Sequence, residues 1–353
     1  MIFSANTMTE KRSQVQASRP IRIIAITRKP ESPSFEHRIT RYRKGLTEYG
    51  IELTFQTLPR SVRGQWQVLK DMRRYDGVWW HRHLLSPWVS TRLHKETPPI
   101  VFDFDDPLVY SARGGGQHSW SRQILFSRML RRSSVALAAS KSLADLALPF
   151  CPSVVEIPMA VDIPTRVESP VRATNKRLEL LWLGTEKTQP YLDLIRRPLM
   201  DLGYRKDVKL RLVAHKPMTF GDLEVDFRPW SANEQTMALQ ACDIGLCPMP
   251  DTVWTRGKCP YKVLQYMAHA MPWIGSAVGE NRIMAGSNLK EQRGLCASSN
   301  DQWMQMLVQL TQDANLRRTL GNQSYKYVAG NHCRSILINR LAKTWRNVLG
   351  QEK

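Results

Sequence analysis

Residues 243 to 279 combine a predicted strand, a basic loop, a predicted helix and a second short strand. Pro260 stands where the helix would begin, and Pro272 follows its last turn. The N-terminus of a helix favours anions, because it offers unpaired N–H groups and the positive end of the helix dipole. Three basic side chains add full charges at this point: Arg256, Lys258 and Lys262. The segment therefore predicts a phosphate-binding site.

A second cluster of polar residues follows an apolar run in the first half of the chain. Asp103, Asp105 and Asp106 stand at the end of a predicted strand, where α/β sheets place their ligands. Asp-x-Asp can hold a divalent metal, because Mg²⁺ and Mn²⁺ prefer hard oxygen ligands. The carboxylates can instead contact an acceptor or act as a general base. They can also form a structural turn that caps the next helix. All three interpretations remain open from the residues alone.

Three more residues lie near predicted strand or loop ends of the first half. Arg38, Arg82 and His118 are candidates for the lining of a cleft. The alternative for each is a solvated or ion-paired side chain.

Strand and helix patterns alternate along the whole chain, which predicts an α/β fold with parallel sheets that hold these side chains. Phe35, Ile39, Tyr42 and Leu46 are spaced 4, 3 and 4 apart and predict one continuous helix with a buried face. Near the end of the chain, apolar residues between 337 and 348 repeat at helical spacing and predict a last amphipathic helix.

Composition shifts divide the chain into five parts. The polar stretch 1–20 lacks the apolar core of a signal peptide and is predicted to be a disordered tail. Residues 21–165 form the first predicted domain, 166–176 a linker, 177–330 the second domain and 331–353 the final helix.

The run from Gly257 to Ala268, GKCPYKVLQYMA, resembles the donor-site region of bacterial glycosyltransferase family 4, the group 1 glycosyl transferases. The stretches 180–185 (LLWLGT) and 225–230 (VDFRPW) are similar to other parts of that donor domain. The resemblance implies the GT-B fold, in which two Rossmann-like domains face each other across a cleft and a C-terminal helix crosses back. It also implies transfer of a sugar from a nucleotide-sugar cosubstrate with retention of configuration, without a metal or resident cofactor.

The resemblance also assigns expected roles to individual residues. We expect Asp103, Asp105 and Lys262 to be catalytic, and Arg38, Arg82, Asp106 and His118 to lie on the acceptor side. The expected donor-binding residues are Gly184, Thr185, Trp230, Arg256, Lys258, Lys262, Gln265, Ser276, Gly279, Glu280 and Asn281. The chain departs from the family at Gly257 and Gln265, where many members carry two glutamates that contact the sugar and the ribose.

The chain is strongly basic, with 51 Lys or Arg against 31 Asp or Glu and a formal net charge of +20. The excess is shared about equally by the two halves. Nucleic acid, an anionic membrane surface or anionic substrates would each explain it. No apolar run approaches the roughly 18 residues that span a bilayer, so we expect a cytoplasmic protein, with possible peripheral contact at the inner membrane face.

Three functional hypotheses follow. The first is a glycosyltransferase with a glycan or lipid-linked acceptor, of the kind used in polysaccharide biosynthesis. The second is an inactive GT-B scaffold that binds a sugar nucleotide or a partner, suggested by Gly257 and Gln265. The third is a basic nucleic-acid-binding protein, which the absence of any helix-turn-helix, zinc-finger or aromatic RNA-binding pattern disfavours.

Overall fold

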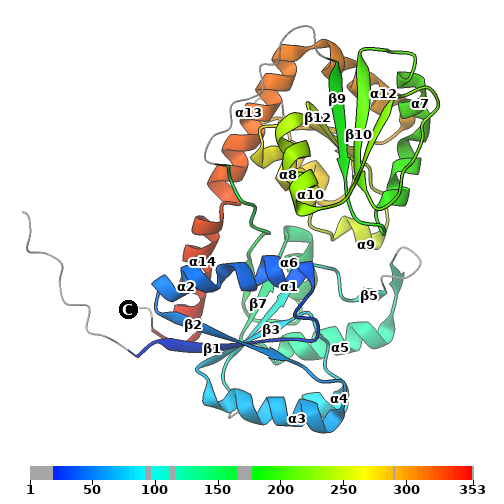
Figure 1. Ribbon diagram of the computed structural model, residues 1–353. Helices are drawn as coiled ribbons and strands as arrows, with labels where there is room; N and C mark the ends of the chain where they lie inside the picture. The colour runs from blue at the N-terminus through cyan, green and yellow to red at the C-terminus, as the bar shows by residue number, and fades with distance from the viewer. Residues whose placement is uncertain (1–18, 92–96, 112–115, 165–176, 289–290, 352–353) are drawn as a thin grey trace, which may run out of the picture.

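The computed structural model describes residues 19–91, 97–111, 116–164, 177–288 and 291–351 (Figure 1). Most of the tail predicted for 1–20, and the linker predicted for 166–176, lie outside the described residues. The described chain forms two α/β domains, each built on a six-stranded parallel sheet.

The first sheet has the strand order β2-β1-β3-β4-β7-β8. Its strands are rich in Val, Ile, Leu and aromatic residues and are mostly buried, as expected for parallel strands that are covered on both faces. The strands are β1 (Ile21–Thr27), β2 (Ile51–Thr57), β3 (Gly77–His81), β4 (Ile100–Phe104), β7 (Val135–Ala138) and β8 (Val154–Glu156). A short hairpin, β5 (Tyr110–Ser111) and β6 (Gln117–His118), follows β4.

Helices cover both faces of this sheet. One face is covered by α3 (Val62–Asp71), continued by η2 (Met72–Arg74), and by α4 (Pro87–Ser90), α5 (Trp120–Arg131) and α6 (Lys141–Ala147). The other face is covered by α1 (Pro33–Arg38), η1 (Thr40–Tyr42), α2 (Arg43–Glu48) and the last helix, α14 (Arg334–Val348).

The helix predicted around residues 35 to 46 is interrupted in the structure. Phe35, Ile39, Tyr42 and Leu46 are all buried, as their spacing predicts. However, Ile39 leaves the helical region with φ −134°, and α1 ends there. The break directly follows Arg38, whose side chain is buried in the interior of the domain.

The second sheet has the order β11-β10-β9-β12-β13-β14. Its strands are β9 (Leu178–Leu183), β10 (Val208–Ala214), β11 (Val225–Pro229), β12 (Ile244–Cys247), β13 (Trp273–Ser276) and β14 (Leu295–Ala297). The surrounding helices are η4 (Gln189–Ile195), α7 (Arg196–Leu202), α8 (Ala232–Ala241), α9 (Val253–Arg256), α10 (Tyr261–Ala268), α11 (Glu280–Ala285), α12 (Asn300–Gln312) and α13 (Ala314–Asn331).

The chain returns to the first domain at its end, and α14 lies against the first sheet in Figure 1. Trp345 is fully buried with its ring 6.0 Å from that of Trp79, and Gly77 leaves the space that the Trp345 ring fills. The crossing predicted for the last helix is confirmed. Among the residues described, no helix is both long and apolar enough to cross a membrane.

Candidate active site

The loop between β12 and α10 carries the basic residues of the second domain. α10 is held in place by its apolar side, on which Val263, Leu264 and Met267 are buried. Tyr266 donates from its hydroxyl to the carbonyl of Leu246, 3.1 Å away in β12. These contacts fix the first turn of α10 beside the carboxyl ends of the central strands.

Lys262 projects from this first turn toward the end of β9. Its Nζ lies 4.0 Å from the centroid of the Trp182 ring and donates to Thr188 Oγ1 at 3.2 Å. A Cβ at Gly184 would lie 2.5 Å from Nζ, so the glycine leaves the space that the ammonium occupies. Burial lowers the pKa of Lys262 to about 8, with a smaller contribution of the same sign from Lys258. The structure therefore holds a poorly solvated cation at the end of β9.

Lys258 and Arg256 differ in their surroundings. Lys258 is partly buried and follows Gly257, which packs against Pro107 of the first domain, so it lies where this loop meets that domain. Arg256 is exposed and makes a bidentate ion pair with Asp251, with Nε–Oδ1 and Nη2–Oδ2 distances of 2.6 and 3.0 Å. Only Lys258 therefore joins Lys262 in the described arrangement.

Polar side chains of the loop after β13 are bonded to the protein backbone. Ser276 Oγ accepts from the backbone N–H of Met249 at 2.9 Å, and Asn281 Nδ2 donates to the carbonyl of Ser276 at 3.1 Å. Gly279 has φ +49°, and a Cβ there would lie 2.3 Å from the carbonyl oxygen of Arg256. Ser276, Gly279 and Asn281 thus shape the loop, which leaves its backbone as the part that can approach a donor.

The remaining predicted donor residues are spread along the same edge of the sheet. Thr185 is exposed directly after β9, and Trp230 is 55% exposed at the end of β11. Trp230 therefore does not belong to the core of the second domain. Gln265 is buried on α10. Gly257 is packed against Pro107 of the first domain, 3.1 Å from where its Cβ would be.

Arg38 and Asp103 form a buried ion pair in the first domain. Arg38 Nε lies 2.8 Å from Asp103 Oδ1, Trp79 Nε1 donates to Asp103 Oδ2 at 3.0 Å, and Arg38 also donates to the carbonyl of Ile157. The Asp103 side chain has no exposed surface, and that of Arg38 is 1% exposed. This placement differs from the catalytic role expected for Asp103 and from the acceptor-side position expected for Arg38. It gives them a structural role, because they are enclosed by β3, β4 and α1.

Asp105 ends a chain of hydrogen bonds that runs through the first domain. Ser34 Oγ donates to Asp105 Oδ2 at 2.7 Å and lies 3.0 Å from His81 Nε2. The other ring nitrogen of His81 lies 3.2 Å from Thr27 Oγ1. Burial lowers the pKa of His81 to about 3, so the ring is neutral and the chain can orient Asp105 without adding charge. No sequence pattern points to Ser34 or Thr27, which stand 71 and 78 positions before Asp105.

Arg82 joins the two remaining aspartates. It adopts φ +57°, which is uncommon for a side-chain-bearing residue. Its guanidinium lies 3.2 Å from Asp105 Oδ1 and pairs with Asp106. Burial raises the pKa of Asp106, against the opposing charges of Arg82 and of Lys258 from the other domain. His118 lies apart from this cluster on β6, exposed and bonded to Gln123 at 3.0 Å.

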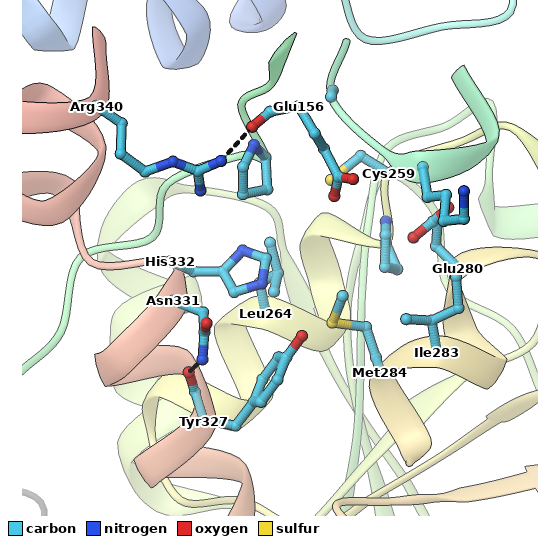
Figure 2. A pocket seen from close by; sticks show the side chains of 14 residues that line it. Glu156, Cys259, Leu264, Glu280, Ile283, Met284, Tyr327, Asn331, His332 and Arg340 are labelled. Atoms are coloured by element: carbon cyan, nitrogen blue, oxygen red, sulfur yellow. Dashed lines mark hydrogen bonds between the residues drawn. The ribbon is translucent and has the colours of Figure 1, made fainter. Parts of the chain in front are cut away.

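The two domains touch on both sides of α10. Tyr261 Oη lies 3.3 Å from His37 Nδ1, and Glu280 accepts from Ser142 at 3.1 Å. Burial raises the pKa of Glu280. A cavity of about 130 Å³ lies at this junction. Figure 2 shows Cys259 and Glu280 on one side of it, and His332 and Arg340 on the other. Glu280 therefore lies at the domain junction and not beside Lys262.

No family profile matches the chain, and no curated protein matches its sequence. Among solved structures, sucrose-phosphate synthase from Thermosynechococcus elongatus is similar, with a TM-score of 0.70, 13% identity, and coverage of 94% of this chain and 100% of that one. HepE of Anabaena in complex with UDP has a TM-score of 0.65, 14% identity, and coverage of 93% and 100%. A glycosyltransferase from Rickettsia africae ESF-5 has a TM-score of 0.67, 11% identity, and coverage of 95% and 100%.

The chain has the GT-B fold. The likeness extends over both domains and the final helix, because more than nine-tenths of this chain and all of each similar chain are covered. The predicted fold class is confirmed. At these identities the likeness concerns the fold, and it does not establish the narrower family 4.

Proposed function

We propose that this chain is a glycosyltransferase that moves a sugar from a nucleotide-sugar donor to a glycan or lipid-linked acceptor. The observation that carries the proposal is the half-buried ammonium of Lys262, held between Trp182, Gly184 and Thr188 at the end of β9. HepE shares the fold and has been solved in complex with UDP and with UDP-glucose. A UDP-sugar is therefore the first donor to test.

In the proposed reaction, the bond between the anomeric carbon and the diphosphate breaks, and a bond from that carbon to an acceptor hydroxyl forms. Negative charge grows on the departing diphosphate. Lys262 and Lys258 would stabilise it, since fixed charges in a poorly solvated site act strongly on developing charge. Two cations at this place support a mechanism without a bound metal, and the family resemblance supports retention of configuration.

The acceptor side of the proposal centres on Asp105. Its carboxylate is fixed by Ser34 and Arg82, and the neutral His81 stands behind Ser34. Asp105 would orient the acceptor hydroxyl or accept its proton. Asp103 and Arg38 would contribute indirectly, because their ion pair holds the end of β4, which Asp105 follows. The wider setting we propose is polysaccharide biosynthesis by a cytoplasmic protein, with peripheral contact at the inner membrane face.

The experiment that tests the proposal is a thermal-shift panel of UDP, GDP, ADP and CMP and their sugars, each with Mg²⁺ and with EDTA. A rise in Tm with one nucleotide family in EDTA supports the donor site and identifies the base. Lys262→Ala should abolish that rise, whereas Lys326→Ala, an exposed lysine on α13, should retain it. A rise only with Mg²⁺ contradicts the metal-independent mechanism, and no rise with any nucleotide contradicts the donor site.

One observation favours the second candidate, an inactive scaffold. Gly257 stands at the position where many family members carry a glutamate, and it is packed against Pro107 of the other domain, so the described arrangement has no room for a longer side chain. Nucleotide binding without transfer or donor hydrolysis would favour the scaffold over the enzyme.

A further inference from the structure

Two helices of the first domain carry the same pattern on their exposed sides. Along α3 and η2, the exposed residues Val62, Trp66, Lys70 and Arg73 are spaced 4, 4 and 3 apart. Along α5, the exposed residues Trp120, Ile124, Arg128 and Arg131 have the same spacing. In each helix this spacing forms one stripe, with two apolar residues at the N-terminal end and two cations after them. We call these eight residues the basic–aromatic face.

The two stripes lie on the same side of the first domain. The buried sides of α3 and α5 pack into one apolar core on one face of the sheet, and α4 contacts both helices. Figure 1 shows these helices on the side of the domain opposite to α1 and α2. Their outer sides therefore form one surface.

The apolar residues of this surface are not the ones that form the core of the first domain. The core contacts of α5 are made by Phe126, Met129 and Leu130, which are buried. Trp120 and Ile124 are 74% and 51% exposed, and on α3 Trp66 and Val62 are 41% and 47% exposed. Four large apolar side chains in contact with water on neighbouring helices are typical of an interaction surface.

The charge of the same helices is strongly one-sided. Residues 60–74 and 120–132 together contain nine Lys or Arg and a single acid, Asp71. Asp71 accepts a hydrogen bond from Gln67 at 3.1 Å. The surface is therefore complementary to an anionic partner.

We infer that the basic–aromatic face docks on an anionic lipid bilayer. Trp is favoured at the boundary between lipid headgroups and acyl chains, and neighbouring Lys and Arg attract anionic phosphates. A nucleic acid would use the cations, but the regular apolar half of each stripe has no counterpart in a phosphate backbone. The inference goes beyond the transferase proposal and does not depend on it, because docking requires no turnover.

The orientation of the helices relates this surface to the cleft. In a parallel α/β sheet the helices run opposite to the strands, so their N-termini lie at the carboxyl edge of the sheet, where Asp105 stands. Trp120 begins α5 and its ring lies 4.9 Å from that of His118 in the hairpin. The hairpin in turn contacts the second domain, where Gly116 packs against Trp254. The apolar ends of both stripes therefore lie toward the cleft, so that docking would bring the bilayer close to the acceptor side.

The test is co-sedimentation of the full chain with vesicles of phosphatidylcholine alone and of phosphatidylcholine mixed with phosphatidylglycerol, at low and high salt. We expect binding to the mixed vesicles that weakens at high salt, at least tenfold stronger than binding to phosphatidylcholine. The double variant Trp66→Ala/Trp120→Ala and the double variant Arg128→Gln/Arg131→Gln should each lose most of this binding. All four side chains are exposed, so an unchanged Tm will show that each variant is folded.

A matched control uses the exposed Tyr204 and Arg197 of the second domain. Tyr204→Ala/Arg197→Gln should bind the mixed vesicles as the wild type does. Equal binding to both vesicle types, or full binding by the Trp variant, would overturn the inference. So would tight binding of single-stranded RNA that Arg128→Gln/Arg131→Gln abolishes while vesicle binding is absent. The nucleotide-induced rise in Tm should be unchanged in all three variants, which separates failure of docking from failure of the donor site.

Discussion

The basic side chains on the two sides of the cleft differ in whether a carboxylate pairs with them. In the first domain, Arg38 pairs with Asp103, and Arg82 with Asp105 and Asp106. In the second domain, Lys262 contacts a ring and a hydroxyl, and no carboxylate of the described residues pairs with it. A paired cation holds the protein together, whereas a poorly solvated cation without a counter-charge gains most from an arriving anion.

Both sides of the cleft are rich in charge, but the paired cations stabilise the fold, whereas Lys262 is available to bind an anion. This difference predicts that substitution of the paired Arg38 acts mainly on stability, and that substitutions around Lys262 act mainly on nucleotide affinity. The following changes test that separation.

The largest effect is expected for Arg38→Met. It removes one partner of a fully buried pair and leaves Asp103 without its cation, which typically costs about 3–5 kcal/mol of unfolding free energy. Chemical denaturation measures the loss. The double variant Arg38→Met/Asp103→Leu should recover most of it, because it removes both charges. A single variant as stable as the wild type would show that the pair is not buried in solution.

Lys262 should make nucleotide affinity depend on pH. Its pKa is lowered to about 8 in the free protein, and a bound diphosphate favours the ammonium, so the pKa in the complex is higher. Affinity should be full below pH 8 and fall as the pH rises through 8, by at most about tenfold per pH unit. Isothermal titration calorimetry in buffers of different ionisation enthalpy should show proton uptake on binding near pH 8.

Lys262→Arg is the control for this titration, because a guanidinium stays charged over the whole range. Its affinity should not change with pH between 7 and 10.

The stability of the protein gives a second test of the lowered pKa of Lys262. The folded pKa is below the ordinary 10.5, so the charged form opposes folding below pH 8, and this penalty disappears as the pH rises toward 10.5. Lys262→Met should therefore stabilise the protein at pH 7, and a flat affinity profile for the wild type would contradict the assignment.

The sequence predicts the architecture well because the architecture depends on periodic apolar residues. The two parallel sheets and the amphipathic last helix follow from such patterns, as the burial of Leu337, Leu341 and Trp345 shows. The crossing of that helix to the first domain is implied by the family resemblance and not by periodicity. The break at Ile39 does not follow, since it coincides with an ion pair between residues 65 positions apart. A hydrophobic pattern carries no information about such a contact.

The site is less predictable for the same reason. The types of Ser276 and Asn281 suit contact with a donor, but both side chains bond to protein backbone, Ser276 to Met249 in the loop after β12 and Asn281 to Ser276. Ser34 and His81 are ordinary residues in the sequence and become notable only because folding places them behind Asp105. Residue type predicts which chemistry is available, and only the three-dimensional partners determine which group remains available for a ligand.

A smaller effect is expected for Gly184→Ala. The added Cβ would lie 2.5 Å from Lys262 Nζ and 2.7 Å from Cη2 of Trp182, so the ammonium must move. We expect a loss of about 1 kcal/mol in nucleotide binding, roughly fivefold, because one charged contact is weakened. Fluorescence titration with the nucleotide identified above measures it. Gly330→Ala in α13 is the control, since nothing lies within 4 Å of its Cβ, and it should leave affinity unchanged. Unaltered affinity in Gly184→Ala would show that the position of Lys262 does not matter.

The smallest effect is expected for Arg256→Gln, although the sequence places Arg256 beside Lys258 as a phosphate ligand. In the structure its guanidinium is exposed and paired with Asp251 through two hydrogen bonds. An exposed pair of this kind contributes little, so nucleotide affinity should fall by no more than about twofold. Asp251→Asn frees the guanidinium without removing it and should also change affinity little. If Arg256→Gln instead weakened binding as much as Lys262→Ala, Arg256 would have to leave Asp251 for the donor. The contrast between paired and unpaired cations would then apply only to the protein without a bound nucleotide.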